Sequence, residues 1–132
     1  MTVAVAHKVG PTGRLALEHG LREARLRGTD LAVLHVVVEA IDADRAEGYR
    51  LGIADEIERA VGVQPDLEWD LHLRTAVSDP AGSVLELVRR LDPEVLVIGA
   101  RRRSPVGKAL LGSVAQHLIL EATVPVLVVK AG

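Results

Sequence analysis

Apolar residues along the chain fall into two patterns, short continuous runs and stripes that recur every three or four positions. A continuous run of strand length indicates a strand buried on both faces, as in a parallel sheet. Such runs occupy residues 2–6, 31–38, 94–99 and 125–130. The stripes predict amphipathic helices. They consist of Leu17, Leu21 and Ala24; of Ala46, Tyr49, Ile53, Ile57 and Ala60; of Val84, Leu87, Val88 and Leu91; and of Ala115, Leu118, Ile119 and Ala122.

Residues 66–73 follow a third pattern, in which apolar and polar side chains alternate strictly. Successive side chains of a strand point to opposite faces, so this segment predicts a strand with one buried and one wet face. We therefore expect it at an edge of the sheet, or covered on one side only.

Helix boundary signals separate these segments. Gly62 follows the second stripe and is expected to end that helix. Asp79 and Pro80 fit the N-cap and the first position of the third helix. Gly112 and Ser113 precede the fourth stripe, and the serine is expected to cap that helix, a role that is compatible with phosphate contact.

Strands and helices alternate along the whole chain, from a first strand to a last one, with a basic loop after the fourth strand. This order predicts an α/β fold, with an open, mainly parallel sheet of five strands and helices on both faces. The length of 132 residues suits one domain, which we expect to span residues 1–132.

Composition narrows the classes of function. Only 2% of the residues are aromatic and the formal net charge is −2, which argues against a nucleic-acid binder. The apolar runs are far shorter than the roughly 20 residues of a membrane helix, so no membrane partner is expected. The chain has no cysteine, which excludes disulfides and thiolate chemistry and agrees with a cytoplasmic location.

The segment between the fourth strand and the last helix is strongly basic. It contains Arg101, Arg102, Arg103 and Lys108. Seven residues separate Gly99 from Gly107, whereas a Walker A loop has four, so this is not a P-loop of that class. The cations either hold an anion through paired hydrogen bonds, or form a solvated rim or meet acidic residues of a partner chain. Both interpretations stay open.

The last third of the chain carries the most specific motif. A glycine follows the fourth strand, residues 111–114 (Leu-Gly-Ser-Val) open a short helix, and residues 125–129 (Pro-Val-Leu-Val-Val) form the final strand. This arrangement resembles the C-terminal signature of the universal stress proteins. The resemblance covers nearly all 132 residues.

The resemblance implies a Rossmann-like sheet in the order 3-2-1-4-5, with a ligand cleft at the carboxyl ends of the strands. In nucleotide-binding members, the base and ribose meet the first and second strands, and the phosphates meet the loop after the fourth. The implied ligand is ATP or AMP, with or without magnesium, and no intrinsic metal is expected. Carried to this sequence, the cleft residues are Ala6, His7, Lys8, Val36, Ile98, Gly99, Arg101, Arg102, Gly107, Gly112, Ser113 and Val114.

Two departures from the nucleotide-binding pattern stand out. That pattern has a glycine, two residues, a second glycine, nine residues and Gly-Ser. Gly99, Gly112 and Ser113 match this spacing, but Arg102 replaces the second glycine. Such members also usually carry an aspartate after the first strand, where residues 6–9 here read Ala-His-Lys-Val. The open question is whether Arg102 holds the phosphate or occupies its place.

The five histidines do not have the spacing of a metal site. His35 lies within an apolar strand, which is typical of a hydrogen-bonded core histidine. His7, at a strand end, is expected either to contact a ligand or to be a hydrogen-bonded structural residue. We find no positioned nucleophile, general base or metal cluster for rapid turnover, so an enzyme is not expected. Slow ATP hydrolysis stays open.

The family order places the last strand at the sheet edge opposite residues 66–73. That strand is apolar on both faces, and such an edge invites pairing with another chain. We therefore predict a homodimer joined antiparallel through this strand, as is common in the family; a monomer is the alternative. The expected interface residues are Pro125, Val126, Leu127, Val128 and Val129.

These features predict a cytoplasmic stress-response protein that binds an adenine nucleotide and acts as a sensor or regulator. The alternative is a dimeric interaction module that binds no nucleotide, and whose basic loop meets another anion or an acidic partner. Arg102 and the missing aspartate favour this alternative. An ATP-using hydrolase or ligase of a related fold ranks below both, because no Ser-Gly-Gly-x-Asp-Ser loop follows the first strand.

Overall fold

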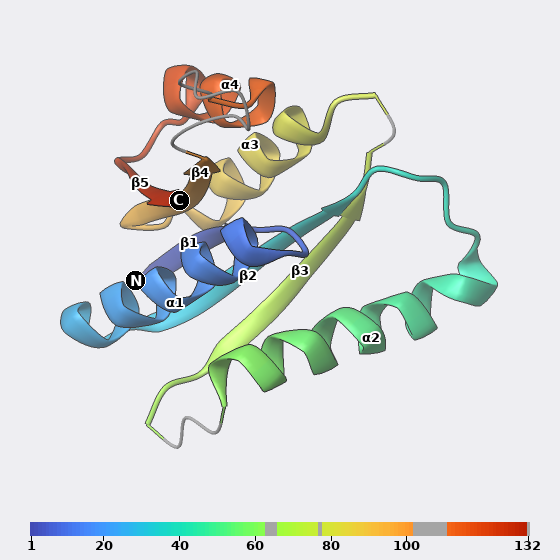
Figure 1. Cartoon of the computed structure of the whole chain (residues 1–132), viewed down its shortest axis with the longest axis horizontal. Helices are drawn as coiled ribbons and strands as arrows, with labels where there is room; N and C mark the ends of the chain where they lie inside the picture. Colours follow the sequence, from blue (N-terminus) through green and yellow to red (C-terminus); the bar gives the residue numbers. More distant parts are fainter. Residues whose placement is uncertain (63–65, 77, 102–110, 132) are drawn as a thin grey trace.

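Strands and helices alternate in the computed structural model, which describes residues 1–62, 66–76, 78–101 and 111–131 (Figure 1). The elements are β1 (Thr2–His7), α1 (Pro11–Arg27), β2 (Asp30–Val37), α2 (Ala43–Val61), β3 (Trp69–Thr75), α3 (Pro80–Leu91), β4 (Val95–Arg101), α4 (Ser113–Glu121) and β5 (Val126–Ala131). This order confirms the predicted alternation.

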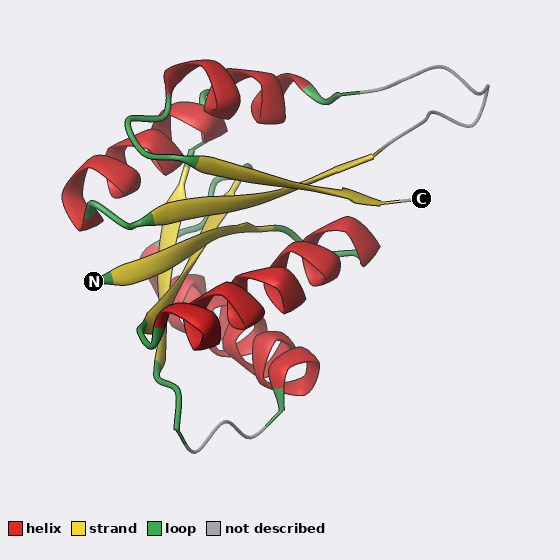
Figure 2. Ribbon diagram, turned by 90° about the vertical axis from the view of Figure 1, so that its left-hand side faces the viewer, coloured by secondary structure: helices red, strands yellow, loops and turns green. Residues whose placement is uncertain are grey.

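The five strands form one parallel sheet in the order β3-β2-β1-β4-β5. Helices α1 and α2 lie on one face of this sheet, and α3 and α4 lie on the other (Figure 2). The predicted Rossmann-like α/β fold and strand order are therefore confirmed. The strand order reverses between β1 and β4, and a crevice is expected at the carboxyl ends of these two strands.

Two aliphatic layers hold the helices against the sheet. Val3 and Val5 of β1 pack toward α1 and α2, whereas Ala4 between them packs toward α3 and α4. Ile57 of α2 and Leu87 of α3 are buried in their respective layers. Burying one such large aliphatic side chain stabilises the fold by about 1.5–3 kcal/mol. The core can therefore be built with almost no aromatic residues.

The sequence signals for two helix boundaries are confirmed. Gly62 ends α2 with φ 73°, a left-handed value that favours glycine, and its N–H donates to the carbonyl oxygen of Glu58. Asp79 is the N-cap of α3, and its Oδ1 accepts a hydrogen bond of 2.9 Å from the backbone N–H of Gly82. Pro80 is the first residue of α3.

The third strand differs from its prediction in its bounds. The alternating pattern covers residues 66–73, but β3 spans Trp69–Thr75, because pairing with β2 begins only at Trp69. The expected edge position is confirmed by the strand order. Its faces also differ as expected, with Leu71 buried and Asp70 exposed.

Candidate functional site

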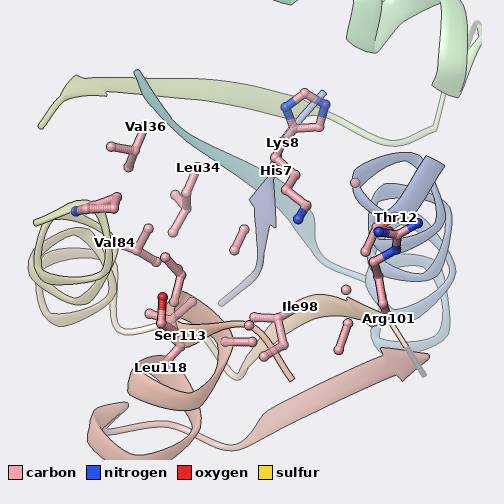
Figure 3. A pocket seen from close by; sticks show the side chains of 18 of the residues that line it. His7, Lys8, Thr12, Leu34, Val36, Val84, Ile98, Arg101, Ser113 and Leu118 are labelled. Atoms are coloured by element: carbon pink, nitrogen blue, oxygen red, sulfur yellow. The ribbon is translucent and has the colours of Figure 1, made fainter. Parts of the chain in front are cut away.

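A cavity of about 430 Å³ opens at the carboxyl ends of β1 and β4, where the strand order reverses (Figure 3). Its walls come from the ends of β1, β2 and β4, from the N-terminal parts of α1 and α3, and from α4. This volume lies within the usual range of small-molecule sites, roughly 300–1,000 Å³.

One side of the cavity is apolar and lies beside α3 and α4. Leu34 and Val36 of β2, Val84 of α3 and Leu118 of α4 lie together on this side in Figure 3. The same residues belong to or pack against the core layer between the sheet and these helices. The apolar wall is therefore part of the rigid core, and it can bury the face of a flat organic ring.

The other side of the cavity is polar and lies beside α1, where Figure 3 shows Thr12 and Arg101, and the Lys8 side chain lies between the two sides in that view. Among the described lining residues, the charged side chains are Lys8 and Arg101, and both are cationic. Ser113 lies on the opposite side, with Val84. The cavity therefore joins an apolar half to a positively charged half.

Two glycines bring the start of α1 against the strand ends. A Cβ on Gly13 would lie 1.6 Å from the carbonyl oxygen of Lys8, and a Cβ on Gly99 would lie 2.6 Å from that of Thr12. Both distances are shorter than Cβ atoms tolerate. The backbone of Lys8 and of Thr12 is thus held in place at the cavity by close packing.

Helices α1 and α4 both begin at the cavity, and both have a glycine N-cap, Gly10 and Gly112. Glycine has no side chain that could accept hydrogen bonds from the first turn. The backbone N–H groups at such a helix start, together with the positive end of the helix dipole, favour an anion. Thr12 and Ser113 line the cavity from these two helix starts.

Ten of the twelve predicted cleft residues line this one cavity. They are Ala6, His7, Lys8, Val36, Ile98, Gly99, Arg101, Gly112, Ser113 and Val114. The other two, Arg102 and Gly107, lie outside the described residues. That these residues bind a ligand stays a prediction.

The prediction that Ser113 caps α4 is wrong. The N-cap is Gly112, in an extended conformation, and Ser113 is the first residue of the helix. A serine cap at position 113 would make residue 114 the first residue of the helix, whereas α4 begins at Ser113. No described atom lies within 4 Å of a Cβ built on Gly112.

Behind the cavity, His7 and His35 form a buried pair across β1 and β2. Their Nδ1 atoms lie 2.9 Å apart, and the two residues are opposite each other in the strand register. One Nδ1 must donate and the other accept, so at least one of the rings is neutral. The expected hydrogen-bonded core histidine at position 35 is confirmed. His7 has the same structural role, and Figure 3 shows its ring directed away from Ile98 and Ser113.

The surroundings of this pair disfavour its protonation. Burial, and after it the neighbouring His35, lower the pKa of His7 to about 4. Burial also lowers the pKa of His35, against the opposing effects of the nearby Glu56 and of a hydrogen bond with the His7 backbone. Neutral rings at physiological pH follow from both effects.

The universal stress protein family model matches residues 1–130. The chain belongs to the universal stress protein family. A universal stress protein from Mycolicibacterium smegmatis is 40% identical over 140 residues, which cover 97% of this chain and 96% of that protein.

Solved universal stress protein structures share the fold. One from Archaeoglobus fulgidus is 32% identical with a TM-score of 0.75, and the match covers 98% of this chain and 97% of that one. A second from Archaeoglobus fulgidus, in complex with dAMP, is 27% identical with a TM-score of 0.67, over 98% of this chain and 96% of that one.

Several lining residues of this universal stress protein were missed by sequence reasoning. They are Thr12, Gly13, Leu34, Val38, Pro80, Val84, Ala100, Ala115 and Leu118. Most are apolar residues whose helix or strand pattern indicates only burial. The positions of Thr12 and Gly13 could have been found from the sequence, because they follow the turn at Gly10 after the first strand, and the ligand cleft is expected at that strand end.

In the described part of the chain, no group of three or more His, Cys, Asp or Glu residues could hold a metal ion. None of the described helices is both long enough and apolar enough to cross a membrane.

Proposed function

We propose that this universal stress protein binds an adenine nucleotide in the cavity and acts as a sensor or regulator in the cytoplasm. The observation that carries the proposal is the division of the cavity into an apolar half and a half with cationic side chains and the start of α1. A relative at 27% identity was solved in complex with dAMP, which supports the same ligand class here.

In the proposed complex, the adenine ring lies against Val36 and Val84, and the 5′-phosphate lies toward Thr12 and Arg101. The apolar wall excludes water from the faces of the base. Arginine binds phosphate through paired hydrogen bonds, and each such charge-assisted bond contributes about 1.5–3 kcal/mol. AMP and ATP both satisfy this arrangement.

We propose binding rather than catalysis as the activity. Rapid phosphoryl chemistry needs a positioned base or water and usually a magnesium ion held by carboxylates. Among the described lining residues, none is a carboxylate. Magnesium is therefore left out of the proposed complex, and slow ATP hydrolysis is no part of the proposed function.

We further propose a homodimer through β5, with Pro125, Val126, Leu127, Val128 and Val129 at the interface. The two sheet edges differ in a way that supports it. At the β3 edge, Arg50 and Arg74 donate hydrogen bonds of 3.1 Å to the carbonyl oxygens of Leu71 and Leu73. The carbonyl of Glu68 faces β2, and carbonyls alternate in direction along a strand. Those of Leu71 and Leu73, three and five residues further on, therefore point away from β2.

Calorimetric titration of the intact protein with AMP and ATP tests the binding proposal. We expect saturable binding of one nucleotide per chain, and a loss of about tenfold or more in affinity for Arg101→Ala. The matched control is Arg22→Ala, an exposed α1 arginine outside the lining, with unchanged affinity. No binding at millimolar nucleotide would contradict the proposal.

An interaction module without nucleotide is the second candidate. It is favoured by exposed apolar side chains on α4: Ile119 is 38% exposed and Leu120 is 79% exposed. Under this alternative, light scattering would give a complex with a protein partner or a dimer, while neither AMP nor ATP would shift the melting temperature.

A further inference from the structure

The position of Lys8 bears on which nucleotides the cavity prefers. Lys8 directly follows the last residue of β1, and its carbonyl oxygen packs against Gly13 so closely that no Cβ fits between them. The start of this side chain is thus fixed by the fold, although the side chain itself is exposed.

The Lys8 ammonium lies in the middle of the cavity as Figure 3 displays it. In that view the apolar side chains Leu34 and Val36 are on one side of it, and Thr12 and Arg101 are on the other. A nucleotide with its base on the apolar side and its 5′-phosphate toward Arg101 would place its sugar between the two, beside Lys8.

The chemistry of sugar recognition depends on the charge at that point. A carboxylate accepts hydrogen bonds from the free ribose hydroxyls, whereas a cation at the same place accommodates a phosphate on a sugar oxygen. Lysine has three donors and no acceptor. Among the described lining residues there is no carboxylate, so the charged groups offer nothing that selects a free diol.

We propose that the cavity prefers nucleotides that carry a second phosphate on the 2′ or 3′ oxygen of the sugar, held by Lys8. This inference rests on the proposed nucleotide-binding function and names the ligand class of the same site. The 5′-phosphate keeps its place near Arg101, so each of the two cations meets a different phosphate.

Three isomeric ligands separate this effect from the mere number of phosphate groups. Adenosine 5′-diphosphate, adenosine 2′,5′-bisphosphate and adenosine 3′,5′-bisphosphate have the same atoms and the same number of phosphates. Titration calorimetry of the intact protein at physiological ionic strength gives their dissociation constants. We expect at least one bisphosphate to bind about tenfold or more tightly than the 5′-diphosphate. The 2′ and 3′ isomers identify which oxygen carries the recognised phosphate.

Lys8→Met removes the charge and keeps an unbranched side chain. We expect this variant to lose the preference for the bisphosphate, because its affinity for the bisphosphate falls at least about threefold more than its affinity for the 5′-diphosphate. Arg22→Ala is the control for a lost surface charge. Unchanged melting temperatures of the unliganded variants show that folding is intact.

The outcomes distinguish failure of the proposed nucleotide binding from failure of the proposed preference for a second phosphate on the sugar. If no adenine nucleotide binds, the proposed function fails. If the 5′-diphosphate binds as tightly as both bisphosphates, or if Lys8→Met weakens all three ligands equally, nucleotide binding stands and this inference is overturned. In the last case, Lys8 holds the 5′-phosphate.

Discussion

Gly99 and Gly112 both belong to the family motif, yet their surroundings differ. A Cβ on Gly99 would lie 2.6 Å from the Thr12 carbonyl oxygen and 2.8 Å from the Thr12 Cγ2, whereas a Cβ on Gly112 would have no atom of the described residues within 4 Å. The first glycine is therefore required by the protein's own packing. The described packing places no such requirement on the second.

This difference predicts different results for the two alanine variants. Gly99→Ala should lower the free energy of unfolding by about 1–3 kcal/mol, because α1 must move away from β4. Gly112→Ala should lower it by less than about 1 kcal/mol, the usual cost of a weaker N-cap residue, since its φ is −61° and no atom of the described residues lies within 4 Å of the new Cβ. Urea unfolding of both variants measures this. Equal destabilisation by the two substitutions would contradict the packing role of Gly99.

The His7–His35 pair predicts a stability loss in mild acid. The folded-state pKa of His7, about 4, lies below its ordinary value of 6.5, so the unfolded chain binds the proton first as the pH falls. The contribution of this neutral pair to stability is complete above pH 6.5 and decreases between 6.5 and about 4. Melting temperatures across this window should fall with pH.

Two variants isolate the pair from other titrating groups. His7→Leu with His35→Leu replaces both hydrogen-bonding partners by apolar groups, which is far less costly than leaving one unpaired. The melting temperature of the double variant should fall less with pH between about pH 6.5 and pH 5, a window above the ordinary range of carboxylates. The control His117→Gln, at an exposed position, should show the same fall of melting temperature with pH as the unchanged protein. A double variant with the full slope would disprove the assignment.

At the scale of elements, the two edges of the sheet are unlike each other. Arginine side chains donate to outward carbonyls of β3, whereas β5 is an apolar edge strand with Val126 and Val128 only partly buried. Charged groups at an edge hinder pairing with another chain, and an apolar edge promotes it.

Val128→Pro should therefore convert the proposed dimer to a monomer. The carbonyl of Pro125 accepts from Leu96 of β4, so in the alternating strand the N–H of Val128 points away from β4. Proline at that position removes an outward donor and leaves the ladder to β4 intact. Leu127→Pro is the comparison, since it removes a donor to β4 and should lower stability as well. Light scattering that gives a dimer for Val128→Pro would contradict this interface.

Local sequence patterns predicted the elements well, because each pattern reports directly on burial. Three of the four continuous apolar runs became the inner strands β1, β2 and β4, and the fourth became the edge strand β5. The alternating segment became the other edge strand, β3. The bounds of β3 depend on where β2 begins to pair with it, and the alternation of side chains within the segment carries no information about that pairing. The start of α4 was misplaced for a similar reason, since Gly112 and Ser113 are both acceptable N-caps by composition.

At the scale of the whole molecule, the strand order creates the cavity. The reversal between β1 and β4 lets α1 and α4 begin at the same place from opposite faces of the sheet. The family resemblance supplied this order, and with it ten cleft residues that line the cavity. The apolar wall of Leu34, Val84 and Leu118 could not be predicted, because these residues meet only once α3 and α4 pack on the sheet. The His7–His35 contact likewise depends on the register of β1 and β2.

The central claim is that this cavity is a nucleotide site, and a crystal structure of the protein grown with AMP tests it most directly. Adenine density between Val36 and Val84, with the phosphate toward Thr12 and Arg101, is the expected result. Ordered AMP bound elsewhere, or an empty cavity at saturating AMP, would contradict the claim.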